Sequence, residues 1–253
     1  MNAENDILNL FEPISLTEME DVLLLNRTDT KYLLTDEDFL RYLEEIQQNY
    51  RVLDINNVRR ANYKTLYFDT PDNLFYLQHH REKPTRIKVR KRQYVDSNLS
   101  FLEVKIKSKE RTDKQRIVID NMNESLSEAE HNFINQYFES PDILTPKLWN
   151  SFERITLVSK IASERLTIDR NISFTFENNY QELKNLVVAE VKQEASSRNS
   201  TFVLALKREH VRNMGFSKYC MGSAGLNKKL KYNMFKGKFL HIKRLTNESA
   251  GMF

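Results

Sequence analysis

Polar and apolar residues alternate along several segments of this chain with the period of two that is typical of β-strands. In 85–95, four cations alternate with apolar residues such as Ile87 and Val89. The four cations are Arg86, Lys88, Arg90 and Arg92. Successive side chains of a strand point to opposite faces, so one face of this strand is a row of cations. Similar patterns, rich in β-branched or aromatic residues, predict strands over 27–34, 61–69, 99–107, 114–120, 154–161, 164–176 and 186–194.

Helices interrupt the predicted strands. Capping signals and apolar spacing predict helices over 36–49, 71–80, 128–138 and 200–214. The first follows Thr35, which forms a capping-box signature with Asp38, and the last is expected to end at Gly215 as its C-cap. Only five Gly and five Pro occur, and no linker-like stretch separates the segments. We therefore expect one domain over residues 1–253, mainly antiparallel β with flanking helices, of the α+β class.

The pairing of an ionisable face with an apolar face recurs on at least five strands. Ionisable residues on the other predicted strands are Arg27, Asp29 and Lys31; Glu103, Lys105 and Lys107; Lys114 and Arg116; Arg165; and Glu190 and Lys192. In a two-layer protein such faces meet water. In a closed antiparallel barrel of about eight strands they can turn inward and line a tunnel, while the apolar faces pack under the helices. We expect the closed barrel.

The bulk composition limits the class of protein. The chain has 253 residues, 39 Lys and Arg against 35 Asp and Glu, and a net charge of only +4, which does not favour a generic nucleic-acid binder. One cysteine, Cys220, excludes an internal disulfide, and the five histidines lack zinc-ligand spacing. The N-terminus is unlike a signal peptide and no apolar run approaches the roughly 20 residues of a membrane span. We expect a soluble, cytoplasmic protein.

A tunnel lined by cations is costly to leave empty. Interior charges lose hydration and repel one another by a few kcal/mol per pair at an effective dielectric constant near 20. A bound polyanion together with a metal ion relieves both costs. Phosphate fits best, because arginine binds it with two parallel hydrogen bonds and lysine acts as a point charge.

The same residues give a resemblance to a known family. The chain resembles the VTC domain, the polyphosphate polymerase branch of the triphosphate tunnel metalloenzyme superfamily, from about residue 24 to 235. The matching motifs are Arg27-x-Asp29-x-Lys31-Tyr32, Tyr67-Phe68-Asp69-Thr70, Arg86-Ile-Lys88-Val-Arg90, Glu103-Val-Lys105-x-Lys107, Lys114-x-Arg116, Arg165-Leu-Thr-Ile-Asp169, Glu190-Val-Lys192 and Ser217-Lys218-Tyr219-Cys220. Each motif is short, and their order and spread along the chain make the set specific.

The resemblance implies an activity and a set of site residues. The activity is transfer of the γ-phosphoryl group of ATP to a growing inorganic polyphosphate chain, with release of ADP. Residues expected at the reacting phosphates are Lys31, Lys88, Arg90, Lys105, Arg165 and Lys218. Further phosphate-binding residues are Arg27, Arg86, Arg92, Lys107, Lys114, Arg116 and Lys192. Glu190 and Glu103 are the expected ligands of a divalent metal, Mn²⁺ or Mg²⁺.

One motif departs from the hydrolases of that superfamily. They carry Glu-x-Glu-x-Lys on the first strand, where this chain has Arg27-x-Asp29-x-Lys31. The first acid is replaced by a cation and the second is shortened. Fewer carboxylates weaken a two-metal site built to activate water. The departure favours transfer over hydrolysis.

Several residues keep two interpretations. Glu190 can bind metal or pair with tunnel cations, and Glu103 can bind metal or orient Lys105 or Arg90. Asp69 is expected to serve a turn or helix cap, and Asp169 to pair with a cation. His79 and His80 are expected at a solvated helix end, and Cys220 and Tyr219 in packed positions. The basic segment 228–231 is either a cap on the tunnel mouth or an exposed patch.

Three functions compete. The first is the polymerase; the others are a metal-dependent hydrolase of tripolyphosphate or nucleoside triphosphates, and a polyphosphate-binding module without catalysis. The expected partners are ATP and polyphosphate rather than nucleic acid, because aromatic residues are not interleaved on the cationic face. In related systems the domain works with a membrane partner, which here would be a separate polypeptide. Oligomeric state, metal identity and direction of product exit stay open.

Overall fold

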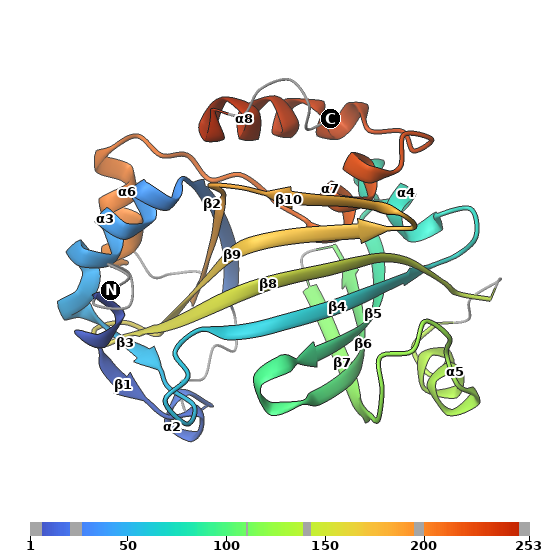
Figure 1. The fold of residues 1–253 in the computed structure, drawn as a ribbon, viewed down its shortest axis with the longest axis horizontal. Coiled ribbons are helices and arrows are strands. Elements are labelled where there is room, and N and C mark those ends of the chain that lie inside the picture. The colour runs from blue at the N-terminus through green and yellow to red at the C-terminus, as the bar shows by residue number, and fades with distance from the viewer. Residues whose placement is uncertain (1–6, 21–26, 110, 139–142, 195–199, 248–253) are drawn as a thin grey trace.

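A curled antiparallel sheet organises the fold (Figure 1). The computed structural model describes residues 7–20, 27–109, 111–138, 143–194 and 200–247. The strands are β1 (Glu12–Ile14), β2 (Arg27–Leu34), β3 (Tyr50–Leu53), β4 (Ala61–Asp69), β5 (Thr85–Tyr94), β6 (Leu99–Ser108), β7 (Arg111–Ile119), β8 (Thr145–Ser159), β9 (Glu164–Phe176), β10 (Asn179–Leu183) and β11 (Val187–Glu194). The helices are α2 (Leu16–Glu20), α3 (Asp36–Ile46), α4 (Leu74–His80), α5 (Glu128–Asn135), α6 (Thr201–Arg208), α7 (Lys218–Leu226) and α8 (Lys236–Thr246).

The sheet is an open half-barrel, so the prediction of a closed barrel is wrong in this respect. Its main path runs β2-β11-β9-β8-β4-β5-β6-β7, with β10 beside β9 and the β1–β3 pair beside β8. The path ends at β2 and β7, and these two strands do not pair within the described residues. Each of these end strands pairs on one side, β2 with β11 and β7 with β6, so the hydrogen-bonded ladder is not continuous around the described sheet.

The outer face of one half of the sheet is apolar and packs under two helices. Buried residues there come from β2, β8, β9 and β11: Tyr32, Leu34, Ile155, Leu157, Leu166, Ile168, Val187, Ala189 and Val191. They pack with Phe39, Tyr42, Leu43 and Ile46 of α3 and with Phe202, Ala205 and Leu206 of α6. Thr35 caps α3, accepting a hydrogen bond from the backbone N–H of Asp38 at 3.0 Å. The apolar alternation of these strands therefore faces outward, as expected.

The outer face of the other half packs under α5. Its buried residues from β4, β5 and β6 are Leu66, Phe68, Val89, Leu102 and Val104, in contact with Phe133 and Ile134 of α5. Lys91 also lies on this outer face. It is 1% exposed and lies 2.9 Å from the Glu130 carboxylate of α5. Val89 and the partly buried Ile87 thus form outer wall, and the cations of β5 at even positions face inward.

A third group of apolar residues fills one end of the concave face. It joins Leu148, Ile172, Phe174 and Val188 of the sheet to Tyr219, Cys220 and Met221 of α7 and to Phe239 and Ile242 of α8. Cys220 is 1% exposed and Tyr219 is 2% exposed, so both are packed, as expected. Gly222 of α7 permits this approach, because a Cβ there would lie 2.5 Å from Phe174 Cδ1. Helix α7 is thereby fixed against β8 and β9.

Asp69 caps α4, as the sequence predicts. Its carboxylate accepts the backbone N–H groups of Thr70, Phe75 and Tyr76, each at 2.8 Å, and the hydroxyl of Tyr219 at 2.5 Å. At the other end of α4, the expectation of solvated histidines is wrong. His80 is 7% exposed and its Nε2 lies 2.7 Å from the Asn233 amide oxygen. The segment before α8 packs there, a long-range contact with no signal in the local sequence.

Helix α6 ends earlier than predicted. It stops at Arg208, and His210 takes a left-handed conformation with φ of 58°. The N–H of Val211 then bonds the carbonyl of Leu206 at 2.9 Å, which satisfies a carbonyl at the helix end. Gly215 is therefore not the C-cap. The chain between α6 and α7 crosses the end of β2 instead, where the N–H of Met214 bonds the carbonyl of Lys31 at 2.8 Å.

Candidate active site

The concave face of the sheet gathers cations from neighbouring strands. On β5 and β6, Lys88 pairs in register with Lys105, and Arg90 with Glu103. On β7, Lys114 continues the Lys105 row. Across the sheet, Lys31 of β2 pairs with Glu190 of β11. Paired residues of antiparallel strands share a face, so register alone brings these side chains to one surface.

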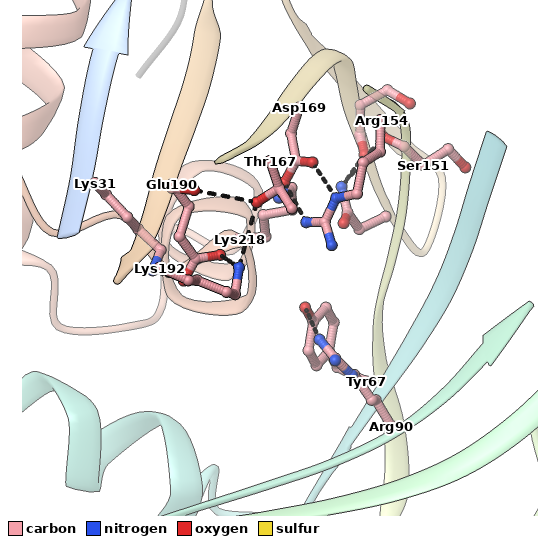
Figure 2. A network of polar contacts seen from close by, with 12 residues as sticks. Lys31, Tyr67, Arg90, Ser151, Arg154, Thr167, Asp169, Glu190, Lys192 and Lys218 are labelled. Atoms are coloured by element: carbon pink, nitrogen blue, oxygen red, sulfur yellow. Dashed lines mark hydrogen bonds and ion pairs between the residues drawn. The ribbon is translucent and has the colours of Figure 1, made fainter. Parts of the chain in front are cut away.

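Glu190 lies between two ammonium groups. Its Oε1 is 2.5 Å from Lys31 Nζ and its Oε2 is 2.8 Å from Lys192 Nζ (Figure 2). Lys192 also donates to the hydroxyl of Thr167 at 3.3 Å. Burial by itself would raise the pKa of Glu190, but Lys192 and Lys31 outweigh it and hold the pKa far below its usual range. Glu190 is therefore a carboxylate at every working pH and a poor proton acceptor.

Glu103 is held in the same way by β5 and β7. It is 1% exposed, and its oxygens lie 2.6 Å from the guanidinium of Arg90 and 2.6 Å from Lys114 Nζ. Burial would raise its pKa, yet Arg90 and Arg92 lower it well below the usual value. Arg90 also reaches the hydroxyl of Tyr67 at 3.5 Å. Glu103 thus fixes the guanidinium of Arg90 on the concave face.

Asp169 joins the sheet to α7. Arg154 of β8 donates to both of its oxygens, from Nε at 2.6 Å and from NH2 at 2.8 Å, and Lys218 of α7 bonds one of them (Figure 2). Burial would raise the pKa of Asp169, but Arg154 and Lys218 keep it well below its usual range. The predicted partner of Asp169, a neighbouring cation, is confirmed. Its carboxylate sets the position of Lys218.

The charged forms of Lys88 and Lys105 are disfavoured by their surroundings. Burial, the largest cause, together with nearby cations lowers the pKa of each to about 8. Lys88 donates to a neutral acceptor, the hydroxyl of Ser217, at 3.2 Å. Arg90 disfavours the charge of both lysines, while Asp29 and Glu190 favour that of Lys105 from across the half-barrel. An anion bound beside these two lysines would relieve the most repulsion on the concave face.

The remaining predicted phosphate-binding residues lie outside the three carboxylate clusters described above. Arg165 donates to the backbone carbonyl of Met19 at 2.9 Å, near the start of the chain. Arg92 lies over the ring of Tyr63 at 5.5 Å, and Arg116, which is exposed, lies over Phe101 at 4.6 Å. Arg86 and Lys107 are register partners at one end of β5 and β6. The side chain of Arg27 lies outside the described part of the structure.

Three residues of this surface were not predicted as site residues, although Ser217 lies in one of the matching motifs. Arg154 and Phe152 belong to β8, which begins at Thr145 rather than at 154, and the pattern of its first half is polar and irregular. The ammonium of Lys218 lies 4.2 Å from the ring centroid of Phe152. Ser217, the partner of Lys88, is also the N-cap of α7 and accepts a hydrogen bond from the Cys220 N–H. The alternation Leu148, Asn150, Phe152, Arg154 was the available signal.

The carboxylates do not form a metal cage by themselves. Among the described residues, no group of three His, Cys, Asp or Glu side chains has the geometry to hold a metal ion. Each oxygen of Glu190 already contacts an ammonium. Mg²⁺ commonly keeps several waters and binds through one or two carboxylates plus substrate phosphates. The donor set fits a metal of that kind, held largely by bound phosphate, rather than a preformed protein site.

Comparison with known proteins places this arrangement in a family. The VTC domain family model matches residues 26–227, a span that includes every strand of the concave face and α7. This chain belongs to the VTC domain family. The match agrees with the resemblance drawn from the motifs. The comparison with curated proteins found no match. Among the described residues, no helix of this VTC domain protein is both long enough and apolar enough to cross a membrane.

Solved structures of low identity also align with the chain. A candidate adenylate cyclase from Vibrio parahaemolyticus is 12% identical, with 78% of this chain and 97% of that chain covered and a TM-score of 0.46. A candidate adenylyl cyclase from Hippeastrum, described with a dominant triphosphatase activity, is 13% identical, with 78% and 95% covered and a TM-score of 0.47. A Bacillus halodurans protein named in the same way is 15% identical, with 76% and 94% covered and a TM-score of 0.45. We infer no function from these likenesses.

Proposed function

We propose that this VTC domain protein is an ATP-dependent polyphosphate polymerase. It transfers the γ-phosphoryl group of ATP to the end of an inorganic polyphosphate chain and releases ADP. The observation that carries the proposal is the concave face, where lysines and arginines from seven strands and α7 outnumber the carboxylates that share the surface. The family match and the motifs support the same activity.

The electrostatics of the surface favour a polyanion as its ligand. The carboxylates Glu190, Glu103 and Asp169 are each already held between two cations. Lys88 and Lys105 have pKa values lowered to about 8, first by burial and then by neighbouring cations. A chain of phosphates supplies repeated negative charge at short spacing, so it can contact several of these cations at once.

The chemistry of the carboxylates favours a phosphate acceptor over water. In the proposed step, an anionic terminal oxygen of the polyphosphate attacks the γ-phosphorus of ATP. The bond from the γ-phosphorus to the β,γ-bridging oxygen breaks, and ADP leaves with that electron pair. The acceptor oxygen carries no proton, so no general base is needed. Water would have to lose a proton, and the strongly lowered pKa values of Glu190 and Asp169 make them poor bases.

Positioning and charge neutralisation are what phosphoryl transfer needs most from a protein. In the proposal, Lys88, Arg90 and Lys105 bind the triphosphate, and Arg90 is held ready by Glu103. Lys31 of β2, Lys192 of β11 and Lys218 of α7 face them and neutralise charge on the phosphoryl oxygens. Arg165 and the flanking cations Arg86, Lys107 and Lys114 contact the chain beyond the reacting group, and Arg92 and Arg116 contact the nucleotide at the other end of the triphosphate.

The proposal includes a divalent metal, Mn²⁺ or Mg²⁺. When bound, the metal would neutralise phosphate oxygens and help to align donor and acceptor. Glu190 is the carboxylate that would hold it, because it lies among the lysines of the face and is already ionised. One of its two ammonium partners, Lys31 or Lys192, would then turn to phosphate.

The experiment is product analysis with the full chain, ATP and Mn²⁺. We expect polyphosphate longer than the starting primer on a gel, and one ADP for each phosphate added. Orthophosphate release without chain growth would instead show the hydrolase. Binding of polyphosphate without ADP formation, equal in the presence of a chelator, would show the binding module. Circular dichroism of the same sample checks that the protein is folded.

A further inference from the structure

The concave face of β5, β6 and β7 changes character from one end to the other. At one end, Arg86 pairs with Lys107 and Lys88 with Lys105; these four residues are the lysine end. At the opposite end, Tyr94 pairs with Leu99. Tyr94, Leu99, Phe101 and Val118 form the aromatic end, because Phe101 pairs in turn with Val118 of β7. Register places both sets on the same face.

The aromatic end is accessible to a ligand. Val118 is 67% exposed and Leu99 is 51% exposed, and Tyr94 and Phe101 are half-buried. The ring of Phe101 lies 5.7 Å from that of Tyr94, edge to face. Exposed apolar side chains gathered at one end of a face that is otherwise ionic indicate a contact surface for an apolar group.

Arginines flank these rings. The guanidinium of Arg116 lies 4.6 Å from the Phe101 centroid. On the other side, Tyr63 lies 4.9 Å from Tyr94, with Arg92 over it at 5.5 Å. Aromatic rings and guanidinium planes are the groups on which proteins stack nucleobases, and such stacking is worth roughly 1–3 kcal/mol per base. The aromatic end therefore has the chemistry of a base-binding surface, which differs from the expectation that aromatic residues are not interleaved on the cationic face.

The lysine end has the opposite chemistry. Its four residues are all cations, and α4 is fixed beside them by a hydrogen bond from the Ile87 N–H to the Gln78 side chain at 3.1 Å. Burial first, and then these same cations, lower the pKa of His79 on α4 to about 2, so this neighbour is neutral. The surface there suits phosphate, and the four described residues that form it carry no aromatic ring.

Positive charge continues outside the half-barrel next to this end. The segment 228–244 contains seven Lys and Arg and no Asp or Glu. It packs on α4: the Lys231 carbonyl accepts from the Tyr76 hydroxyl at 2.7 Å, Asn233 contacts His80, and the ring of Phe235 lies 5.9 Å from that of Tyr76. Lys228, Lys229 and Lys231 are exposed, so the segment presents a basic surface beside the lysine end.

We propose that ATP lies along this face with its adenine ring at the aromatic end and its γ-phosphate toward the lysine end. The growing chain then leaves past α4 along segment 228–244, and ADP leaves by the aromatic end. A rise of about 3.3 Å per residue separates Lys88 from Tyr94 by about 20 Å, room for an extended nucleotide. The inference rests on the proposed function, since it orients the donor of that reaction.

Photo-crosslinking of the full chain with 8-azido-ATP tests the orientation directly. Peptide mapping is expected to find the adduct on residues 63, 94–101 or 116–118, and unlabelled ATP is expected to prevent it. An adduct on 79–88, on 228–244 or anywhere else in the chain would overturn the orientation. The orientation would also be overturned if excess unlabelled ATP did not reduce the labelling.

Calorimetric binding of ATP and of inorganic tripolyphosphate gives a second, independent readout. Phe101→Ala is expected to weaken ATP about tenfold and leave tripolyphosphate unchanged, and Leu99→Ser, at a more exposed position, is expected to act in the same direction. Tyr180→Ala, 65% exposed on β10, is the matched control and should change neither ligand. Equal weakening of both ligands, or of neither, would contradict the orientation. A protein that passes this test and makes no polymer would refute the proposed function alone.

Discussion

The Glu190 carboxylate lies 2.5 Å from the ammonium of Lys31, its register partner on the neighbouring strand. Lys192, two residues along β11, holds the second oxygen at 2.8 Å. One carboxylate thus balances two cations that came from different strands. Replacing it with a neutral amide leaves both ammonium groups free to bind phosphate while removing the carboxylate that the proposed function assigns to the metal.

Glu190→Gln is expected to separate binding from transfer. Without metal, tripolyphosphate should bind at least as tightly as to the wild type, because a negative charge has been removed from the surface. Polymer formation with Mn²⁺ should fall by about 100-fold or more, the size of effect seen when a preorganised charge is removed from a reacting group. Calorimetry and ADP release measure the two quantities.

The matched control is Glu194→Gln, an exposed carboxylate on the same strand. It should alter neither quantity. If Glu190→Gln retained wild-type transfer, the assignment of Glu190 would be wrong. If it bound tripolyphosphate more weakly, Glu190 would be an organiser of the lysines rather than a metal ligand.

Asp169→Asn is expected to destabilise the fold in a pH-dependent way. The folded pKa of Asp169 is depressed by Arg154 and Lys218 in spite of burial, whereas the unfolded value is near 3.9. Its contribution is therefore fully present above about pH 5 and is lost as the pH falls below the unfolded value. Removing one partner of a buried ion pair costs about 3 kcal/mol.

Denaturant unfolding at pH 7 and at pH 2 to 3 measures this contribution. The difference between wild type and Asp169→Asn should shrink as the solution becomes acidic. Asp120→Asn, at an exposed position after β7, serves as the control. A difference that stayed constant over this pH range would mean that the carboxylate charge is not what matters.

Lys88→Met is expected to raise the stability of the fold and to weaken the binding of tripolyphosphate. Burial, outweighing every other cause, lowers the pKa of Lys88 from its ordinary 10.5 to about 8, so its charged form opposes folding at pH 7. The variant should melt a few degrees higher at pH 7, and its advantage should disappear as the pH rises through the window from about 8 to 10.5. Its affinity for tripolyphosphate should fall about tenfold or more.

Thermal melts across that pH window, with and without tripolyphosphate, measure both effects. The added anion should stabilise the wild type more than the variant. A variant that was less stable than the wild type at pH 7 would contradict the claim that the charge of Lys88 destabilises the fold when no anion is bound.

Two glycines provide a paired test of how α7 is fixed. A Cβ at Gly222 would lie 2.5 Å from Phe174 and 2.7 Å from Leu148, whereas nothing lies within 4 Å of one at Gly237. Gly222→Ala should therefore cost about 1–3 kcal/mol and displace Lys218. Gly237→Ala, in α8, should gain up to about 1 kcal/mol from helix propensity. Equal effects on denaturant midpoints would mean that α7 does not pack against β8 and β9 in this way.

The sequence predicted the parts of this fold that local periodicity controls. The alternation of 85–95 set which side of β5 faces inward, and the structure puts Val89 under α5 and Arg90 on the concave face. Thr35 and Asp69 were recognised as caps from their immediate neighbours. In each case the controlling interactions lie within a few residues of the position concerned.

What could not be predicted depends on register between distant segments. Lys218 meets Asp169 across 49 positions, and the two carboxylate oxygens of Glu190 are divided between β2 and β11. The gap between β2 and β7 depends on the curvature of the whole sheet, which the pattern of a single strand does not determine. His80 seemed polar enough for solvent and is instead covered by Asn233 from the far end of the chain.

The fate of the γ-phosphoryl group tests the central claim most directly. Full-length protein is incubated with ATP labelled at the γ-position, Mn²⁺ and a short polyphosphate primer, and the label is followed over time. We predict that the label appears in internal phosphates of lengthening chains, in step with ADP, and that little appears in orthophosphate. Label released as orthophosphate from the earliest time point, with primer length unchanged, would contradict the polymerase.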